Sequence, residues 1–466
     1  MKFINRQREL SFLEREYTSE GASFVVIYGR RRLGKTALIR EFIRNKPGSV
    51  YFLADRSAET VTINLFADVV RRTCGRDLWP DVRLTSWGQA FDLYLQSFST
   101  GNSKQILVLD EFQYLVWSNK AFSTVLQRIW DERLKDRNIF LIICGSSVSM
   151  MLSEALNYHS PLYGRRTGQV ELKPLSFSAL REFIPRKNPV FQAEIYGLTG
   201  GVPKYLEFFN STKTVFEQIL QSILDIDHFL NQEARFILSE EVNEPINYFA
   251  ILKSISAGNR KISAISSDLQ VGMHRLSPYL STLQQIGLVE RQVPVTETMA
   301  HKSKKGLYRI SDCYLRFWFR FIYPNLSDIS LGNTGWLLRK IKIEFNDFMG
   351  SAFEDICRQM IPTLFPGSYD RIGSWWDKRH EVDILAINRS DQTVLLGECK
   401  WSNRLVGKEV LIRLREIAGK IDFGFSPAGI KFILFTKRGF KKELRSELSG
   451  ECLLYDFTDA GWLERI

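Results

Sequence analysis

One segment organises the chain: Phe24-Val-Val-Ile-Tyr-Gly-Arg-Arg-Arg-Leu-Gly-Lys-Thr36. Residues 24–28 predict a short buried strand, residues 29–36 have the spacing of a phosphate-binding loop, and residues 37–44 predict a helix. The glycines let backbone N–H groups wrap a phosphate, and the N-terminus of the helix adds the positive end of its dipole. Because strand, loop and helix follow in the required order, we interpret the segment as a phosphate site rather than a chance match in a loop.

The loop predicts the contacts of a bound nucleotide by position. We expect the Lys35 ammonium group to reach the outer phosphates and the Thr36 hydroxyl to ligate Mg²⁺. The other expected contacts come from the loop and the first helical residue, and they are Gly29, Arg32, Leu33, Gly34 and Ala37. The expected cofactors are therefore ATP or ADP together with Mg²⁺.

A second apolar run, Gln105-Ile-Leu-Val-Leu, ends in the two acids Asp110 and Glu111. The carboxyl ends of strands in a parallel sheet face the bound phosphates. We therefore expect Asp110 to hold Mg²⁺ through water and Glu111 to polarise the attacking water. A solvated strand end is the alternative for such a run on its own, but behind a phosphate loop the two acids are the expected partners.

Another buried run, residues 139–145, ends in the small polar residues Ser146 and Ser147. At this place in a parallel sheet a hydroxyl lies beside the γ-phosphate, so either serine is a candidate sensor of that phosphate, and we select Ser146. A simple turn is an equally weighted alternative.

Paired arginines, Arg165 and Arg166, follow in a loop after the predicted sensor strand. An arginine in such a loop, from the same or a neighbouring subunit, stabilises the charge of the transition state for phosphoryl transfer. A homo-oligomer is therefore among the expected assemblies. Solvated surface arginines are the equally weighted alternative.

Two segments outside the sheet are candidates for contact with the nucleotide base. Residues 5–10, ahead of the first strand, predict either a cap over the base or a packing helix. The second is Gly200-Gly-Val-Pro-Lys-Tyr205, a break before a helix within the otherwise helical residues 176–240. We interpret this helical part as a lid and expect Pro203 to pack near the base.

Composition narrows the class of protein. A chain of 466 residues with 44% hydrophobic residues can build two to four domains with cores. Apolar runs stay shorter than a membrane span, and the six scattered cysteines contain no Cys-x-x-Cys pair, which argues against structural zinc and fits a reducing cytoplasm. The formal charge of +11 permits a nucleic-acid partner, so we expect DNA rather than a membrane.

Three predicted helices followed by two strands make a winged helix out of residues 246–310. The helices are expected at 246–256, 262–270 and 273–287, and the strands at 287–293 and 307–310, joined by a loop with the basic tip His301-Lys-Ser-Lys-Lys305. The functional interpretation is DNA contact through the third helix and the tip. The alternative is a purely structural module.

A second chemical centre is predicted where two strands form a hairpin, residues 381–387 and 393–401. Alternation along a strand puts Glu398 and Lys400 on one face, and Asp383 can meet them from the first strand. Two carboxylates and an amine form a hard oxygen site for Mg²⁺ with a group to position water, and Glu354 on the preceding helix is a candidate third ligand. A structural Glu–Lys salt bridge is the alternative, since buried charges need a partner or a metal.

These motifs resemble a known family. The N-terminal two thirds is similar to the archaeal-type ATPases among the STAND and AAA-related P-loop NTPases, and the stretches that carry the resemblance are 29–36, 109–113, 144–147, 163–166 and 200–203. Residues 308–312 and 315–319 resemble the junction to that family's C-terminal domain of unknown function, DUF234.

That C-terminal domain is similar to PD-(D/E)xK restriction-like nucleases. Asp383 and Glu398-Cys-Lys400 match the nuclease motif, while Val382 stands where its proline is expected. The resemblance implies ATP binding more strongly than it implies DNA cleavage.

The predicted fold is α/β: a P-loop NTPase core with an AAA+-like parallel sheet, a helical lid, a winged helix and a restriction-endonuclease-like domain. The expected boundaries are 1–175 for the ATPase core, 176–240 for the lid, 241–312 for the winged helix, 313–342 for a helical linker and 343–466 for the nuclease-like domain. The predicted function is a cytoplasmic ATPase whose nucleotide state is coupled to DNA binding and Mg²⁺-dependent DNA cleavage. The alternative is a nucleotide-gated DNA-binding or signalling switch whose nuclease-like domain is not catalytic.

Overall fold

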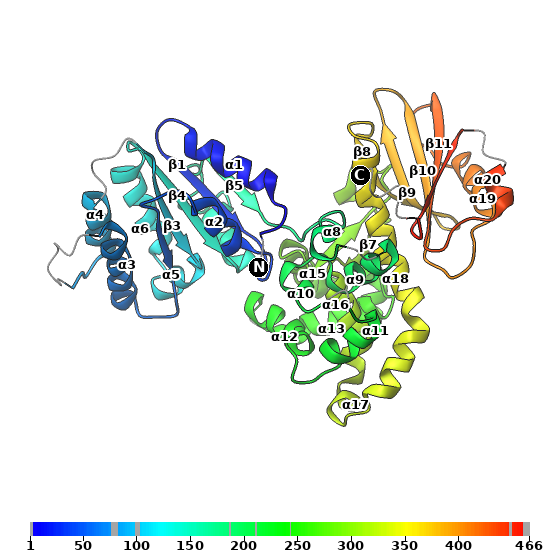
Figure 1. Cartoon of the computed structure of the whole chain (residues 1–466), viewed down its shortest axis with the longest axis horizontal. Coiled ribbons are helices and arrows are strands. Elements are labelled where there is room, and N and C mark those ends of the chain that lie inside the picture. Colours follow the sequence, from blue (N-terminus) through cyan, green and yellow to red (C-terminus); the bar gives the residue numbers. More distant parts are fainter. Residues whose placement is uncertain are drawn as a thin grey trace. The chain divides into compact units, whose positions relative to one another are not determined.

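The computed structural model describes residues 3–75, 83–97, 103–185, 188–209, 212–242, 244–446 and 450–459. The chain divides into two compact units, Met1–Pro174 and Leu175–Ile466 (Figure 1). Within the described ranges, no helix is long and apolar enough to cross a membrane.

The first unit is built on a parallel sheet whose described strands follow the order β2-β3-β4-β1-β5. Every pair of neighbouring strands in it is parallel. All residues of β1 and β4 are buried, which is the pattern of strands covered on both faces. The strands are β1 (Ser23–Tyr28), β2 (Val50–Leu53), β3 (Gln105–Asp110), β4 (Ile139–Gly145) and β5 (Gly168–Glu171).

The helices of this unit pack in two groups. Helix α1 contacts α2, whereas α3 and α4 contact each other and also reach α5 and α6. Aromatic rings fill the second group, with Phe66 stacked 5.5 Å from Phe91 and Trp87 edge-on 4.8 Å from Phe122. The helices are α1 (Gln7–Thr18), α2 (Lys35–Ile43), α3 (Glu59–Cys74), α4 (Trp87–Ser97), α5 (Phe112–Ser118), α6 (Phe122–Ile129), η1 (Trp130–Leu134), α7 (Val148–Met151) and η2 (Leu152–Leu156).

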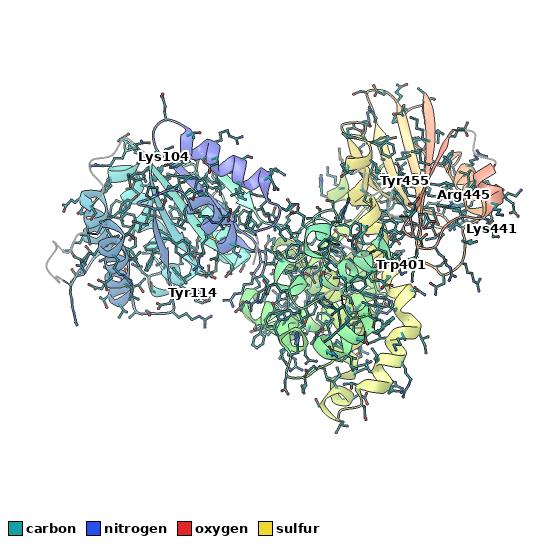
Figure 2. The ribbon with its side chains drawn as sticks, viewed as in Figure 1. Lys104, Tyr114, Trp401, Lys441, Arg445 and Tyr455 are labelled. Atoms are coloured by element: carbon teal, nitrogen blue, oxygen red, sulfur yellow. The ribbon has the colours of Figure 1, made fainter. Side chains whose placement is uncertain are left out.

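The two ends of the sheet differ in chemistry. Figure 2 shows Lys104, which precedes β3, and Tyr114, which follows it in α5, at opposite ends of the first unit. At the amino end, the Lys104 ammonium group donates to the carbonyl of Glu16 and to the Ser23 hydroxyl, each at 2.8 Å. The phosphate loop and the acids after β3 follow the carboxyl ends of their strands, so the predicted nucleotide site lies at the other end of the sheet.

The second unit begins with helices around a tight glycine turn. Gly200 and Gly201 have positive φ angles of 61° and 74°. A Cβ atom on Gly201 would lie 2.1 Å from the Leu175 carbonyl oxygen, so a larger residue does not fit there. The helices are α8 (Leu180–Phe183), α9 (Pro189–Thr199), α10 (Pro203–Leu206), α11 (Val215–Gln218), η3 (Ile219–Ile223) and α12 (Phe229–Glu241).

Helices α13, α14 and α15 then precede a two-stranded antiparallel hairpin in which Val289 pairs with Ile310. The loop of the hairpin is bound to the next sheet, because the Val295 N–H donates to the Ser374 carbonyl at 2.9 Å. The Arg371 guanidinium also donates to the Glu297 carbonyl at 2.8 Å. The elements are α13 (Pro245–Ser256), α14 (Ile262–Leu269), α15 (Met273–Gln285), β6 (Val289–Gln292), η4 (Ala300–Lys302) and β7 (Leu307–Ile310).

An aromatic helical segment connects this hairpin to a long helix. Most of its rings are buried, and the Trp318 indole N–H donates to the Asn231 carbonyl at 2.8 Å. Arg316 and Arg320 interrupt the run and reach acids of α18, so the two charges are paired. The segment comprises α16 (Cys313–Phe317), η5 (Trp318–Ile322), η6 (Tyr323–Asn325) and α17 (Leu326–Ser330), followed by α18 (Thr334–Leu364).

The second sheet has the described order β12-β11-β10-β9-β8, with antiparallel pairing from β8 to β10 and parallel pairing from β10 to β12. Figure 1 shows α18 on one side of this sheet and α19 and α20 on the other. Leu411, Leu414 and Ile417 of α19 pack on the sheet in one buried cluster. The elements are β8 (Arg371–Trp376), β9 (Glu381–Asn388), β10 (Thr393–Lys400), α19 (Lys408–Ala418), β11 (Gly429–Thr436), α20 (Lys442–Ser446) and β12 (Cys452–Asp456).

Candidate functional site

The phosphate loop lies between β1 and α2, and three of its residues have positive φ angles: Gly29 (144°), Arg32 (71°) and Gly34 (86°). A Cβ atom on Gly29 would lie 2.5 Å from the Leu172 carbonyl oxygen, so only glycine fits at the start of the loop. The Lys35 ammonium group donates to the carbonyls of Gly29 (2.7 Å) and Arg30 (2.9 Å). The cation therefore lies over the curved backbone of the loop.

Thr36 and Asp110 meet at the end of the sheet, as their predicted shared role requires. The Thr36 hydroxyl donates to Asp110 Oδ2 at 3.0 Å, and the Tyr51 hydroxyl donates to the same oxygen. Burial and the Asp110 charge raise the pKa of Tyr51, so this phenol stays protonated and remains a donor. Mg²⁺ prefers hard oxygen ligands, and the Thr36–Asp110 pair fits that preference.

The side chains of Glu111, Ser146 and Gln113 form one hydrogen-bonded network. The Ser146 hydroxyl donates to Glu111 Oε2 at 2.7 Å, and the Gln113 amide donates to the same oxygen and to Ser146 Oγ at 2.9 Å. The backbone of Glu111 adopts the left-handed conformation, with φ at 55°, at the start of α5. The predicted base and the predicted sensor are therefore hydrogen-bonded to each other.

Two residues of this site, Tyr51 and Gln113, were not predicted from the sequence. Tyr51 projects from β2 toward Asp110, and Gln113 bridges Glu111 and Ser146. The signal for Gln113 was its position two residues after the predicted base, in the first turn of a helix. Tyr51 had no local signal, because its contact joins residues that are 59 positions apart.

Arg6 ties the N-terminal segment to the phosphate loop. Its guanidinium donates to the carbonyls of Leu33 (3.2 Å) and Lys173 (2.6 Å), and burial lowers its pKa. Together with Tyr28 at the end of β1, it lines a cavity of about 720 Å³. Residues 7–18 form α1, so the segment packs as a helix, and its contact with the base stays a prediction.

Arg165 and Arg166 are both engaged within their own unit. The Arg165 guanidinium forms an ion pair with Asp131 at 2.9 Å. Arg166 donates to the carbonyls of Ala155 (2.9 Å) and Leu156 (3.1 Å). Neither contact reaches the phosphate loop, so a finger role requires at least one of these arginines to leave its partner.

Changing Arg165 and Arg166 together to alanine is expected to lower ATP turnover at least about tenfold while ATP affinity is kept. The expected loss is below the thousandfold of a dedicated arginine finger, because the wild type must first break the Arg165–Asp131 pair. Steady-state phosphate release measures the turnover. The control is Asp131→Asn, which frees Arg165 and should not lower turnover; equal losses in both variants would assign the arginines a structural role.

Pro203 belongs to the second unit, where it occupies the first turn of α10. Tyr205 in the same helix packs against Tyr314, with ring centroids 4.9 Å apart and the ring planes tilted by 51°. The predicted packing of Pro203 near the base stays a prediction.

The second centre brings Asp383, Glu398 and Lys400 together on the C-terminal sheet. The Lys400 ammonium group donates to Glu398 Oε1, and the Cys399 N–H donates to Asp383 Oδ2 at 2.8 Å. Burial, followed by the charges of Glu398 and Glu354, raises the pKa of Asp383 to about 8. These carboxylates therefore lie close enough to repel one another.

Glu398 has an oxygen that the protein leaves unused. Its side chain is 5% exposed, and Oε2 has no hydrogen-bond partner among the described residues. The salt bridge to Lys400, which the sequence left as the alternative, is present but occupies only Oε1. An orphaned carboxylate oxygen beside a second carboxylate fits a hard divalent cation such as Mg²⁺.

Glu354 is nearby but has another partner. It lies 3.6 Å from the Arg358 guanidinium, one turn along α18. Across the described residues, no three His, Cys, Asp or Glu side chains are gathered to hold a metal ion. Mg²⁺ usually keeps several waters and takes one or two carboxylates, so Asp383 and Glu398 suffice for the proposed site, and a ligand role of Glu354 stays a prediction.

Comparisons with known proteins agree with the geometry of the first centre. Residues 3–209 match the model of an ATPase domain predominantly from Archaea, and residues 318–412 match DUF234, archaeal and bacterial proteins of unknown function. An uncharacterized protein of Methanocaldococcus jannaschii, MJECL04, is 34% identical over 469 residues, which cover 98% of this chain and 99% of the relative. An uncharacterized ATP-binding protein of the same organism, MJ0423, is 52% identical over 44 residues, 9% of this chain and 75% of that protein.

Among solved structures, the Walker-type ATPase PABY2304 of Pyrococcus abyssi superimposes with a TM-score of 0.50 at 20% identity. The match covers 68% of this chain and 96% of that one, and it shows a common fold. The predicted α/β class with its parallel P-loop sheet is confirmed. Because a relative matches it nearly end to end and the ATPase model matches residues 3–209, the chain belongs to the archaeal-type P-loop ATPase family that carries a C-terminal DUF234 domain.

Proposed function

We propose that this ATPase uses its nucleotide state to control DNA binding and Mg²⁺-dependent cleavage of DNA. The observation that carries the proposal is the orphaned Oε2 of Glu398 beside Asp383 and Lys400. A buried carboxylate oxygen without a donor is costly, and a bound cation is the simplest way to satisfy it.

At the first centre, ATP hydrolysis follows from the family, and the roles of the side chains are part of the proposal. Lys35 turns from the loop carbonyls to the outer phosphates, and Thr36 and Asp110 hold Mg²⁺. The ion, when bound, neutralises charge that builds up on the phosphates. Glu111, oriented by Ser146 and Gln113, holds the attacking water and accepts its proton.

The second unit supplies the remaining modules in this proposal. Residues 176–240 act as the lid, in which Pro203 packs near the nucleotide base. Residues 241–312 act as the winged helix. Residues 313–342 link the winged helix to the nuclease-like domain, residues 343–466. The order of α13, α14, α15, β6 and β7 supports the winged helix, and the exposed Met273, His274 and Arg275 at the start of α15 suit a recognition helix.

Changing Lys302 and Lys304 to glutamate is expected to weaken DNA binding and to flatten its salt dependence. Both side chains are exposed at the hairpin tip, whereas Lys305 is paired with Glu297 at 2.8 Å and is left unchanged. Each lost phosphate contact lowers the slope of log affinity against log salt by about one.

The matched control makes the same charge change at two exposed lysines of the first unit, Lys120→Glu with Lys135→Glu. Anisotropy titrations of labelled duplex DNA over a range of salt concentrations distinguish the two double variants. If both double variants weaken DNA binding equally, the hairpin tip contributes only its net charge and does not contact the DNA specifically.

At the second centre, Asp383 and Glu398 hold the ion that, when bound, polarises the scissile phosphate and lowers the pKa of a water ligand. Lys400 lies beside Glu398 and either positions that water or stabilises charge on the phosphate. The element order of helix α18, three antiparallel strands, helix α19 and a parallel strand supports the resemblance to PD-(D/E)xK nucleases.

The direct test is nicking of supercoiled plasmid by the purified protein with Mg²⁺, with and without ATP, against an EDTA control. Cleavage that needs Mg²⁺ and responds to ATP supports the proposal. Cleavage that survives EDTA would point to a contaminant or to a different site.

The second candidate function is a nucleotide-gated DNA-binding switch without cleavage. The ion pairs of the second centre favour it. Lys400 already neutralises one Glu398 oxygen, and Arg358 already faces Glu354. If neither Mg²⁺ nor Mn²⁺ supports cutting of single-stranded DNA, duplex DNA or RNA, while DNA binding changes with ATP, the switch is the better account.

A further inference from the structure

A cavity of about 530 Å³ lies within the second unit, between the end of α13, the hairpin β6–β7, the helices α16, η5 and α18, and the strands β8 and β9. Among its described wall residues, arginines outnumber the carboxylates of Asp347, Glu354 and Glu381. The arginines are Arg260, Arg309, Arg316, Arg320 and Arg358. The other four arginines are already ion-paired with carboxylates, so recognition of an anionic ligand by a guanidinium group falls to Arg260.

One side of the cavity is a fixed wall. Asp355 accepts hydrogen bonds from Arg309 (2.5 Å), Arg316 (2.9 Å) and Arg358 (2.6 Å). Burial alone raises the pKa of Asp355, but the three guanidinium groups outweigh it and hold the pKa below its ordinary value. One carboxylate thus orders three arginines, so the wall is fixed. Glu290 also pairs with Arg309, and Glu354 with Arg358, so the charges of this wall are balanced.

Arg260 is the least satisfied of the arginines. Its Nη2 donates to Gln292 Oε1 at 2.9 Å, but its buried Nε has no partner among the described residues. Burial, followed by the charge of Arg309, lowers its pKa, although the charges of three nearby carboxylates act in the opposite direction. An anion placed against Arg260 would offset the effect of burial.

The cavity also offers a flat aromatic surface and a route to the second centre. The half-buried Trp376 lines it from β8. Glu354 and Arg358 belong to its wall, and the Arg358 guanidinium donates to the Asp383 carbonyl at 2.9 Å. The cavity and the proposed cleavage centre therefore share a wall.

We propose that this cavity binds one unpaired nucleotide, with its phosphate on Arg260 and its base against Trp376. Guanidinium groups match phosphate oxygens, and an aromatic ring stacks on any base. The volume lies in the range of small-molecule sites, which suits a single nucleotide and excludes a base pair within a duplex. The role of this nucleotide in cleavage rests on the proposed function; its binding does not.

A free nucleoside monophosphate and the unpaired end of a nucleic-acid strand share this chemistry. The test uses the full chain in EDTA without ATP, and it measures the anisotropy of a short labelled single-stranded oligonucleotide. Arg260→Gln and Trp376→Ala are each expected to lower the affinity about tenfold, the size of one charged hydrogen bond or one base stack. Unlabelled deoxyadenosine monophosphate competes if the ligand is a free nucleotide and fails to compete if a strand is required.

The matched controls are Arg389→Gln and Trp336→Ala, exposed residues that lie outside the cavity wall. Thermal unfolding checks the fold of each variant, and Arg260→Lys replaces Arg260→Gln if the latter does not fold. Affinities that are equal in the cavity variants and the controls would overturn the proposal.

The assay separates this inference from the proposed function. Because EDTA prevents metal-dependent cutting, loss of binding in the cavity variants supports the cavity even if no nucleic acid is ever cleaved. If both cavity variants cleave plasmid at the wild-type rate and bind the oligonucleotide unchanged, the proposal for the cavity is overturned while the proposed function stands.

Discussion

Replacing Lys35 by alanine is expected to abolish detectable ATP binding and hydrolysis. In the structure the Lys35 ammonium group lies on the carbonyls of Gly29 and Arg30, at the inner side of the phosphate loop. A triphosphate placed in that loop needs this cation, because the backbone N–H groups alone leave most of its charge uncompensated. Isothermal titration with ATP and Mg²⁺ measures the loss.

The variant must also be shown to fold, because Lys35 is largely buried. Lys35→Met keeps most of the side-chain volume and is the second variant, and Lys120→Ala is the surface control. If a folded Lys35→Met protein binds ATP with wild-type affinity, the loop is not the nucleotide-binding site.

Glu111→Gln separates binding from chemistry at the same centre. The amide keeps a hydrogen-bond acceptor for Ser146, which now donates to Glu111 at 2.7 Å, but it cannot accept a proton from water. ATP is expected to bind as in the wild type and to be hydrolysed at least about a hundredfold more slowly, the scale of general-base catalysis.

The parts of the fold that could be predicted from the sequence are those in which neighbouring residues carry the information. The order of β1, the phosphate loop and α2 is local, and so is the ending of β3 in Asp110 and Glu111. Alternation along β10 likewise places Glu398 and Lys400 on one face, where they form an ion pair.

The parts that could not be predicted depend on contacts between distant residues. Asp355 and Arg358 are three residues apart on α18, a spacing that indicates their contact. No spacing within an element indicates that Arg309 of β7 and Arg316 of α16 reach the same carboxylate. The partner of Arg165 is Asp131, 34 positions earlier, in η1. A loop arginine that looks free in the sequence is therefore engaged in the structure, which lowers the effect expected from its removal.

Replacing Asp383 by asparagine is expected to lower DNA cleavage at least about a hundredfold, the scale of one electrostatic contribution to a transition state. Asparagine keeps an oxygen that can accept from the Cys399 N–H, which now bonds to Asp383 at 2.8 Å, so the local backbone should be retained. The change removes one of the two charges that hold the ion. Lys400→Ala should cause a loss of similar size by removing the amine beside the water.

Stability gives an independent readout for the same variant. Burial and the charges of Glu398 and Glu354 raise the pKa of Asp383 to about 8, above its value in the unfolded chain. The ionised form is thus disfavoured in the folded protein, and the penalty grows as the pH rises toward that value. In EDTA, Asp383→Asn should therefore keep or raise the Tm at pH 7 to 8. The Tm difference should vanish in acid, where Asp383 is protonated in the unfolded chain as well as in the folded protein.

The matched control is Asp422→Asn, an exposed residue that also accepts a backbone N–H, from Gly424 at 2.8 Å. It should leave both cleavage and Tm unchanged. Plasmid nicking with Mg²⁺ is the assay for all of these variants, and normal cutting by a folded Asp383→Asn protein would exclude this carboxylate from the centre. If the wild type itself does not cut but Asp383→Asn still gains stability, the crowded carboxylates are structural neighbours in a domain that only binds, and the ATPase acts as a switch.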